Sequence, residues 1–144
     1  MSSLEPRVFA THSEEETIRL GEYLSELLPL QGAVLLIGNL GTGKTTLVKG
    51  IARARGAAEA DEVSSPTFPL IHEYGEPPSV FHIDLYRLET EQEVLTLGID
   101  EFLDRHALTL IEWGERFPQL WPKHTPSIHL EHQGDDLRRI TLQL

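Results

Sequence analysis

The sequence predicts a single α/β domain over residues 1–144, with a mixed, mostly parallel central sheet flanked by helices and a C-terminal antiparallel hairpin. Two observations predict this fold class. Short apolar runs of strand length alternate with amphipathic helical segments along the chain, which is typical of parallel sheets. The length of 144 residues fits one domain with a sizeable core.

The N-terminal quarter predicts a strand, a helix and a second strand. Residues 7–11 have the pattern of a short strand. Ser13 followed by Glu16 predicts a capping box, in which each side chain accepts a hydrogen bond from a free backbone N–H at the helix start. The helix is expected to end near Pro29. Residues 32–37 are uninterrupted apolar sequence, as expected for a strand buried on both faces.

The rest of the chain continues this alternation and ends in strands. The expected elements are a helix at 44–55, a loop at 57–69, strands at 70–74 and 79–85, a helix at 89–105 broken around Gly98, a strand at 107–112, and strands at 127–132 and 137–144. Gly56 is suited to the C-cap of the first of these helices. Residues 133–136 are expected to join the terminal strands as a hairpin.

A glycine-rich pattern lies between the second strand and the following helix. The pattern Gly-x-x-x-x-Gly-Lys-Thr is met by Gly38, Gly43, Lys44 and Thr45, and chance would give it in roughly one chain of this length in a few hundred. Its glycines let backbone N–H groups turn toward phosphate oxygens at a helix N-terminus. Lys44 is placed to reach the β- and γ-phosphates, and the Thr45 hydroxyl to bind Mg²⁺. The pattern therefore predicts a P-loop NTPase domain that binds ATP with Mg²⁺.

Two acids are expected near the phosphates, because a P-loop site also needs a carboxylate at the end of a neighbouring strand. Asp84 follows the apolar run 80–83, and Glu112 follows the apolar run 108–111. Asp84 is the natural candidate for the magnesium shell, with a helix cap as the alternative. Glu112 is a candidate for the metal or the attacking water, with a plain surface glutamate as the alternative.

Other residues near these acids have two interpretations each. Ser64, Ser65 and Thr67 surround a proline where nucleotide-sensing loops are found, although the same residues are also good turn formers. Trp113 is suited to packing on the nucleotide, on a partner or in the core. His82 shares a strand face with Asp84, so it could support that carboxylate or simply pack in the core.

Composition excludes several classes of protein. The chain has no cysteine, which excludes disulfides, zinc–cysteine sites and thiol nucleophiles. Lys and Arg total 12 against 23 Asp and Glu, a formal net charge of −11, which opposes direct binding of a nucleic-acid backbone. No apolar run has the length of a membrane span, and the N-terminus lacks signal-peptide features. The cytoplasm is the expected location, and any role on a nucleic acid is expected to run through a protein partner.

Four motifs in order, at 40–46, 65–68, 82–88 and 111–113, resemble those of the TsaE family. The resemblance extends over essentially the whole chain. It implies a P-loop ATPase, weak alone, that takes part in making threonylcarbamoyladenosine at position 37 of tRNA. It also implies docking on a TsaB–TsaD complex, so that tRNA is reached indirectly, through these partners.

The resemblance also implies roles for individual residues. Thr45 and Glu112 match magnesium-site positions, Asp84 a Walker-B-like acid, and Trp113 an aromatic residue beside the nucleotide. Residues 11–14 match a segment near the adenine. The expected catalytic residues are Lys44, Asp84 and Glu112; the expected metal ligands are Thr45, Asp84 and Glu112; the expected nucleotide-binding residues are Glu14, Leu40, Gly41, Thr42, Gly43, Lys44, Thr45, Thr46 and Trp113. Two positions depart from the family pattern, Thr42 where alanine is frequent and Pro69 where a β-former is common.

Three other functions remain as alternatives. A small P-loop kinase would need an acceptor pocket and usually an arginine-bearing lid, and the acidic stretch after Leu88 offers no arginine cluster. A GTP-binding switch would commonly carry an Asn-Lys-x-Asp segment, which is absent from the sequence. A non-catalytic ATP-dependent scaffold would differ from the ATPase only in turnover.

Overall fold

The computed structural model describes residues 5–39, 41–64 and 70–144. The strands are β1 (Arg7–Thr11), β2 (Gly32–Ile37), β3 (Ile71–Tyr74), β4 (Val80–Asp84), β5 (Leu108–Glu112), β6 (Ser127–His132) and β7 (Arg138–Gln143). The α-helices are α1 (Glu14–Leu27), α2 (Lys44–Ala54), α3 (Glu91–Thr96) and α4 (Ile99–Leu103), and short 3₁₀ helices are found at Ala60–Glu62, Gly114–Arg116 and Pro118–Leu120. The predicted α/β class is confirmed.

All seven strands form one mixed sheet in the order β1-β7-β6-β2-β5-β4-β3. The strands at its centre are parallel, because β2 pairs with β5 and β6, and β4 pairs with β5. The remaining pairs, β1 with β7, β6 with β7 and β3 with β4, are antiparallel. The C-terminal hairpin is thus as expected, and it joins the N-terminal strand to the rest of the sheet.

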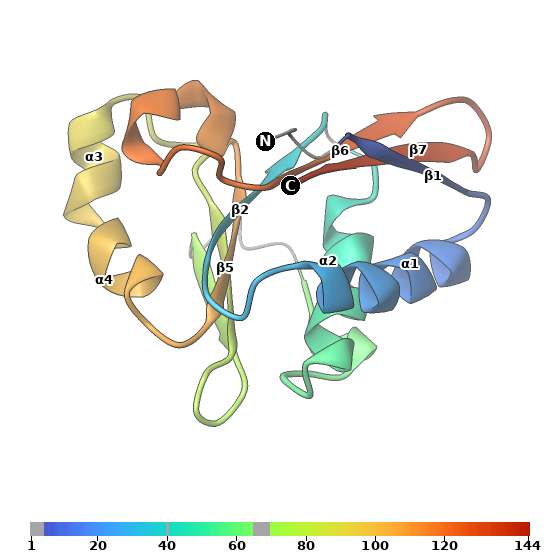
Figure 1. The fold of residues 1–144 in the computed structure, drawn as a ribbon, viewed down its shortest axis with the longest axis horizontal. Helices are drawn as coiled ribbons and strands as arrows, with labels where there is room; N and C mark the ends of the chain where they lie inside the picture. Colours follow the sequence, from blue (N-terminus) through green and yellow to red (C-terminus); the bar gives the residue numbers. More distant parts are fainter. Residues whose placement is uncertain (1–4, 40, 65–69) are drawn as a thin grey trace.

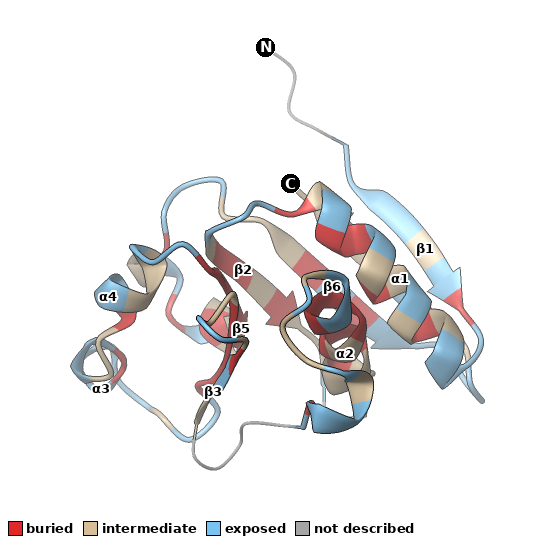
Figure 2. Ribbon diagram, turned by 90° about the horizontal axis from the view of Figure 1, so that it is seen from below, coloured by how far each residue is buried: buried red, intermediate tan, exposed pale blue. Residues whose placement is uncertain are grey.

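Two hydrophobic cores cover the two faces of the sheet. Residues alternate along β2, so that Val34 and Leu36 pack in the core with α1 and α2, whereas Ala33 packs in the core with α3 and α4. In Figure 1 these two helix pairs lie on opposite sides of β2 and β5. Figure 2 shows much of β2 and β5 buried and most of β1 exposed. The central strands carry apolar residues on both faces for this reason.

The first helix begins as the sequence predicts, with one difference in its cap. The Ser13 hydroxyl accepts a hydrogen bond from the Glu16 N–H at 3.1 Å. The Glu16 carboxylate accepts from the N–H of His12 at 2.7 Å, one residue before the cap. The expected reciprocal arrangement is therefore present but shifted by one position on the carboxylate side.

The segment expected as a broken helix at 89–105 forms two separate helices, α3 and α4. Thr90 and Glu93 form a capping box at the start of α3. Gly98 has a φ of 83°, a left-handed conformation that ends α3 and that glycine adopts without strain. Among the described residues, no helix combines the length and apolar character needed to cross a bilayer.

Glycines allow α1 and α2 to approach closely. A Cβ placed on Gly50 of α2 would overlap the carbonyl oxygen of Ile18 in α1, and one on Gly21 of α1 would overlap the carbonyl oxygen of Leu47 in α2. Backbone atoms cannot move aside as a flexible side chain can. The position of α2, and so of the P-loop that precedes it, depends on this contact.

We expect Gly50→Ala to lower the free energy of unfolding by about 2 kcal/mol, because the added methyl group overpacks the helix pair. Helix propensity alone would change stability in the opposite direction, by about 1 kcal/mol in favour of alanine. Urea unfolding followed by circular dichroism measures the sign of the change in the free energy of unfolding. A more stable Gly50→Ala variant would contradict this view of the helix contact.

Candidate functional site

The glycine-rich loop curls between β2 and α2 as a phosphate-binding loop requires. Gly41 and Gly43 have φ angles of 78° and 102°, a left-handed region that favours glycine. The Thr42 hydroxyl donates to the Asn39 carbonyl at 2.7 Å and holds the loop together. Lys44 is the first residue of α2, whose free N–H groups and dipole favour an anion.

Lys44 is buried beside the loop, with 6% of its side chain exposed. Its ammonium group donates to the carbonyl oxygen of Gly38 at 2.6 Å and lies 3.3 Å from Oε1 of Glu112. It also lies 4.9 Å from the centre of the Trp113 ring, within the range of a cation–π contact. The structure therefore brings the predicted lysine, acid and aromatic residue together.

Glu112 ends β5 and is almost fully buried. Its second oxygen, Oε2, lies 2.6 Å from Nε2 of His82, which is completely buried in β4. Burial opposes ionisation of Glu112, but the hydrogen bonds and attraction of His82 and Lys44 outweigh it and hold the pKa below its usual value. Glu112 is therefore a carboxylate at neutral pH.

Asp84 lies beside Glu112, because β4 and β5 are parallel and the two acids are paired across them. Asp84 is buried, and its Oδ1 accepts a hydrogen bond from the N–H of Tyr86 at 2.9 Å. His82 shares the face of Asp84, as expected, but its Nε2 contact is with Glu112. Both acids predicted from strand ends thus lie at one edge of the sheet, near the start of α2.

Trp113 turns out of β5 directly after Glu112. Its φ of 66° is left-handed, which is rare for a bulky residue and ends the strand abruptly. Its ring lies 5.2 Å from that of Tyr86, which is 53% exposed. An aromatic surface therefore extends from Lys44 to the solvent.

Two cavities flank the loop. One of about 550 Å³ is lined on the loop side by Gly38, Asn39 and Thr42, and opposite them by Trp113 and His129. The other, of about 220 Å³, lies at the start of α2, and its lining residues are Ser13, Glu14, Thr17, Gly43, Thr46, Asp136 and Arg138. The expected nucleotide-binding residues Thr42 and Trp113 face one of these cavities, and Glu14, Gly43 and Thr46 face the other.

Oxygen-rich groups fit magnesium better than a transition metal here. Among the described residues, no three His, Asp or Glu side chains group as a metal cage. Asp84, Glu112 and the Thr45 hydroxyl at the start of α2 supply only oxygen ligands, and Mg²⁺ is usually held by one or two carboxylates together with phosphates and water.

Several sequence-based predictions lie outside the described residues, namely those for Leu40, Ser65 and Thr67. Ser64 is described, and its N–H approaches the Tyr74 hydroxyl at 3.4 Å. Sequence reasoning missed Asp136 and Arg138. The hairpin itself was expected, but its place beside α2 depends on the pairing of β6 with β2 and of β7 with β1, which are distant in sequence. No signal in the local sequence identifies them.

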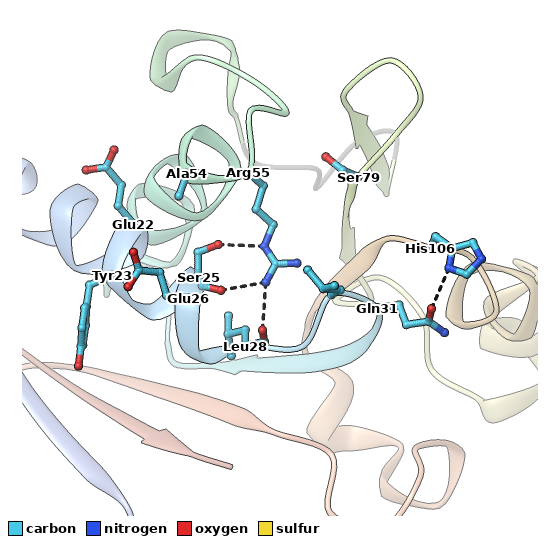
Figure 3. Close-up of a pocket in the computed structure, with 11 residues that line it drawn as sticks. Glu22, Tyr23, Ser25, Glu26, Leu28, Gln31, Ala54, Arg55, Ser79 and His106 are labelled. Carbon is cyan, nitrogen blue, oxygen red and sulfur yellow. Dashed lines mark hydrogen bonds between the residues drawn. The ribbon is translucent and has the colours of Figure 1, made fainter.

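The largest of the cavities described here, about 930 Å³, lies elsewhere (Figure 3). Its lining comes mostly from α1 and the end of α2, together with Gln31, Ser79 and His106, which lie just before β2, β4 and β5. The cavity is therefore at the opposite end of these strands from the P-loop. Its Arg55 donates to the Ser25 hydroxyl at 2.9 Å and to the carbonyls of Ser25 and Leu28, which caps the end of α1. The guanidinium thus has a structural role, and size alone does not identify the functional site.

Comparison with known proteins identifies the family of this chain. The sequence profile of the family described as "Threonylcarbamoyl adenosine biosynthesis protein TsaE" matches residues 11–140. A tRNA threonylcarbamoyladenosine biosynthesis protein TsaE from Treponema pallidum is 36% identical over 132 residues, covering 92% of this chain and 96% of its own. The protein of the same name from Bacillus subtilis is 35% identical, covering 91% and 81%.

A solved structure gives the same result for the fold. The crystal structure of Bacillus subtilis YdiB superposes with a TM-score of 0.76 and 26% identity, covering 99% of this chain and 87% of that one. The profile match covers far more than half of the chain, and the relatives align over most of their length. The chain therefore belongs to the TsaE family, whose members are components of threonylcarbamoyladenosine biosynthesis.

Proposed function

We propose that this protein binds ATP with Mg²⁺ at the P-loop and hydrolyses it slowly, as the ATP-dependent component that acts on a TsaB–TsaD complex in tRNA threonylcarbamoyladenosine synthesis. The observation that carries the proposal is the buried group of Lys44, Glu112 and Asp84 beside the left-handed glycines of the loop. These are a cation and two acids at a helix N-terminus, which is the chemistry of phosphoryl transfer.

The roles follow from the positions of the side chains. The loop amides and Lys44 would bind the phosphates, and the Thr45 hydroxyl with Asp84 or Glu112 would hold the metal. The metal, when bound, would neutralise charge that develops on the phosphate oxygens. Trp113 in one cavity, and Glu14 and Thr46 in the other, would contact the remainder of the nucleotide.

Slow turnover by the isolated chain is supported by the contacts of Glu112. Its Oε2 is held by Nε2 of His82 at 2.6 Å, a contact that does not depend on Lys44 and so can persist when Lys44 turns to the phosphates. A carboxylate held in this way is poorly placed to orient a water molecule, because a general base must reach the proton that it removes. Rearrangement by a partner protein would release it.

Action on tRNA through protein partners is supported by the placement of the basic residues. Lys49 pairs with Glu14 at 3.6 Å and Arg53 with Glu22 at 2.8 Å, so these cations on α2 are already matched by acids. A net charge of −11 adds repulsion from a phosphate backbone. The chain therefore offers little for direct contact with tRNA.

We expect Lys44→Ala to weaken ATP binding by at least about 30-fold, because it removes the buried cation that would pair with the phosphates. Lys123→Ala, which removes an exposed lysine, is the matched control and should bind as the wild type does. Isothermal titration calorimetry with ATP and Mg²⁺ measures both. Equal affinities of the wild type and Lys44→Ala would refute nucleotide binding at this loop.

We expect Asp84→Asn and Glu112→Gln each to reduce the rate of ATP hydrolysis by about 100-fold, since each removes a charge needed for metal or water. Each amide keeps the shape of the acid, so ATP binding should persist. A phosphate-release assay at saturating ATP measures the rate. Full hydrolysis by both variants would show that neither acid serves the reaction.

We expect the isolated protein to show no measurable tRNA affinity at about 0.15 M salt, where charge attraction is screened beyond roughly 8 Å. It should bind a TsaB–TsaD complex more tightly with ATP than without it. Gel-shift and surface plasmon resonance experiments test the two statements separately. Tight binding of tRNA together with no affinity for the complex would refute the partner-dependent function.

A further inference from the structure

The carboxylate of Glu112 is contacted by two side chains, which come from different elements of the fold. Lys44 approaches Oε1 from the start of α2 at 3.3 Å, and His82 approaches Oε2 from the interior of β4 at 2.6 Å. The exposed fractions of the three side chains are 6% or less. Each oxygen of the carboxylate thus has its own protein partner, and the carboxylate has little contact with water.

The proton on His82 can be assigned from this contact. An ionised carboxylate only accepts hydrogen bonds, so the hydrogen belongs on Nε2 and is donated to Glu112. The other ring nitrogen, Nδ1, is buried and has no hydrogen-bond partner among the described residues. A hydrogen placed there would be buried without an acceptor, so the ring donates to Glu112 through Nε2.

Glu112 and a bound phosphate would compete for the ammonium group of Lys44. To bind a phosphate, its ammonium group must leave Oε1 of Glu112, and a buried carboxylate that loses a partner is costly. His82 is in β4 and Lys44 is in α2, so His82 can stay bonded to Oε2 when Lys44 moves away. The carboxylate therefore keeps one strong hydrogen bond after the lysine has turned away.

We propose that His82 is a positioning residue that keeps Glu112 satisfied while Lys44 leaves it for a phosphate, so that His82 raises nucleotide affinity without touching the nucleotide. Glu112, in contrast, lowers that affinity because it competes with phosphate for Lys44. The inference rests on the proposed binding of ATP at the P-loop. It goes beyond that function by giving His82 a role and Glu112 a second one.

The test is a thermodynamic cycle of ATP dissociation constants, measured by isothermal titration calorimetry in EDTA so that metal binding by Glu112 does not contribute. We expect Glu112→Gln to lower the Kd and His82→Leu to raise it, each by about tenfold. The double variant should bind as Glu112→Gln alone does, because no buried charge is left to satisfy. His82→Gln, which retains an N–H donor, should restore most of the affinity lost in His82→Leu.

A merely structural histidine would give a different pattern. His82→Leu would then change the Kd by the same factor with Glu112 and with Gln at position 112, or would not change it at all, and either result overturns the inference. His82→Phe, which keeps a planar ring, replaces His82→Leu if circular dichroism shows that the latter is unfolded. Wild-type protein that binds no ATP even with Mg²⁺ would instead refute the proposed function itself.

Discussion

A carboxylate taken out of water remains ionised only where neighbouring groups replace its hydration. Glu112 has two such neighbours, Lys44 and His82, and they belong to the P-loop helix and to β4. One buried carboxylate therefore links α2 to two central strands of the sheet. The ammonium group of Lys44 is held by this link together with the carbonyl oxygen of Gly38 in the glycine-rich loop.

The link is possible because strand alternation continues the core into the site. Leu108 and Leu110 pack in the core with α2, and Glu112 is the next residue on that face of β5. Val80 begins the corresponding row in β4, which continues through His82 to Asp84. On this face polar residues replace apolar ones toward one end of the strands, at His82 and Asp84 in β4 and at Glu112 in β5. The site is therefore built on rigid elements, and its side chains have little freedom.

The sequence was sufficient to predict the P-loop, the two acids at strand ends and the alternation of strands and helices, because these follow from local patterns. It was not sufficient to predict the partner of His82. The order β2-β5-β4 brings that ring beside Glu112, and strand order depends on pairings between distant segments. The face of His82 was correctly expected, since a period of two is local. The break in the helical segment after Glu89 was also expected at Gly98, which adopts a left-handed conformation.

The same contacts extend from the site toward the surface. Lys44 lies against Trp113, and Trp113 packs on Tyr86, more than half of which is exposed. A movement of Lys44 toward a phosphate would remove a cation from one face of Trp113 and change the packing of the ring. A partner protein that covers Tyr86 would contact the other end of this series. Under the proposed function, nucleotide binding and partner binding would then be coupled through these packed side chains.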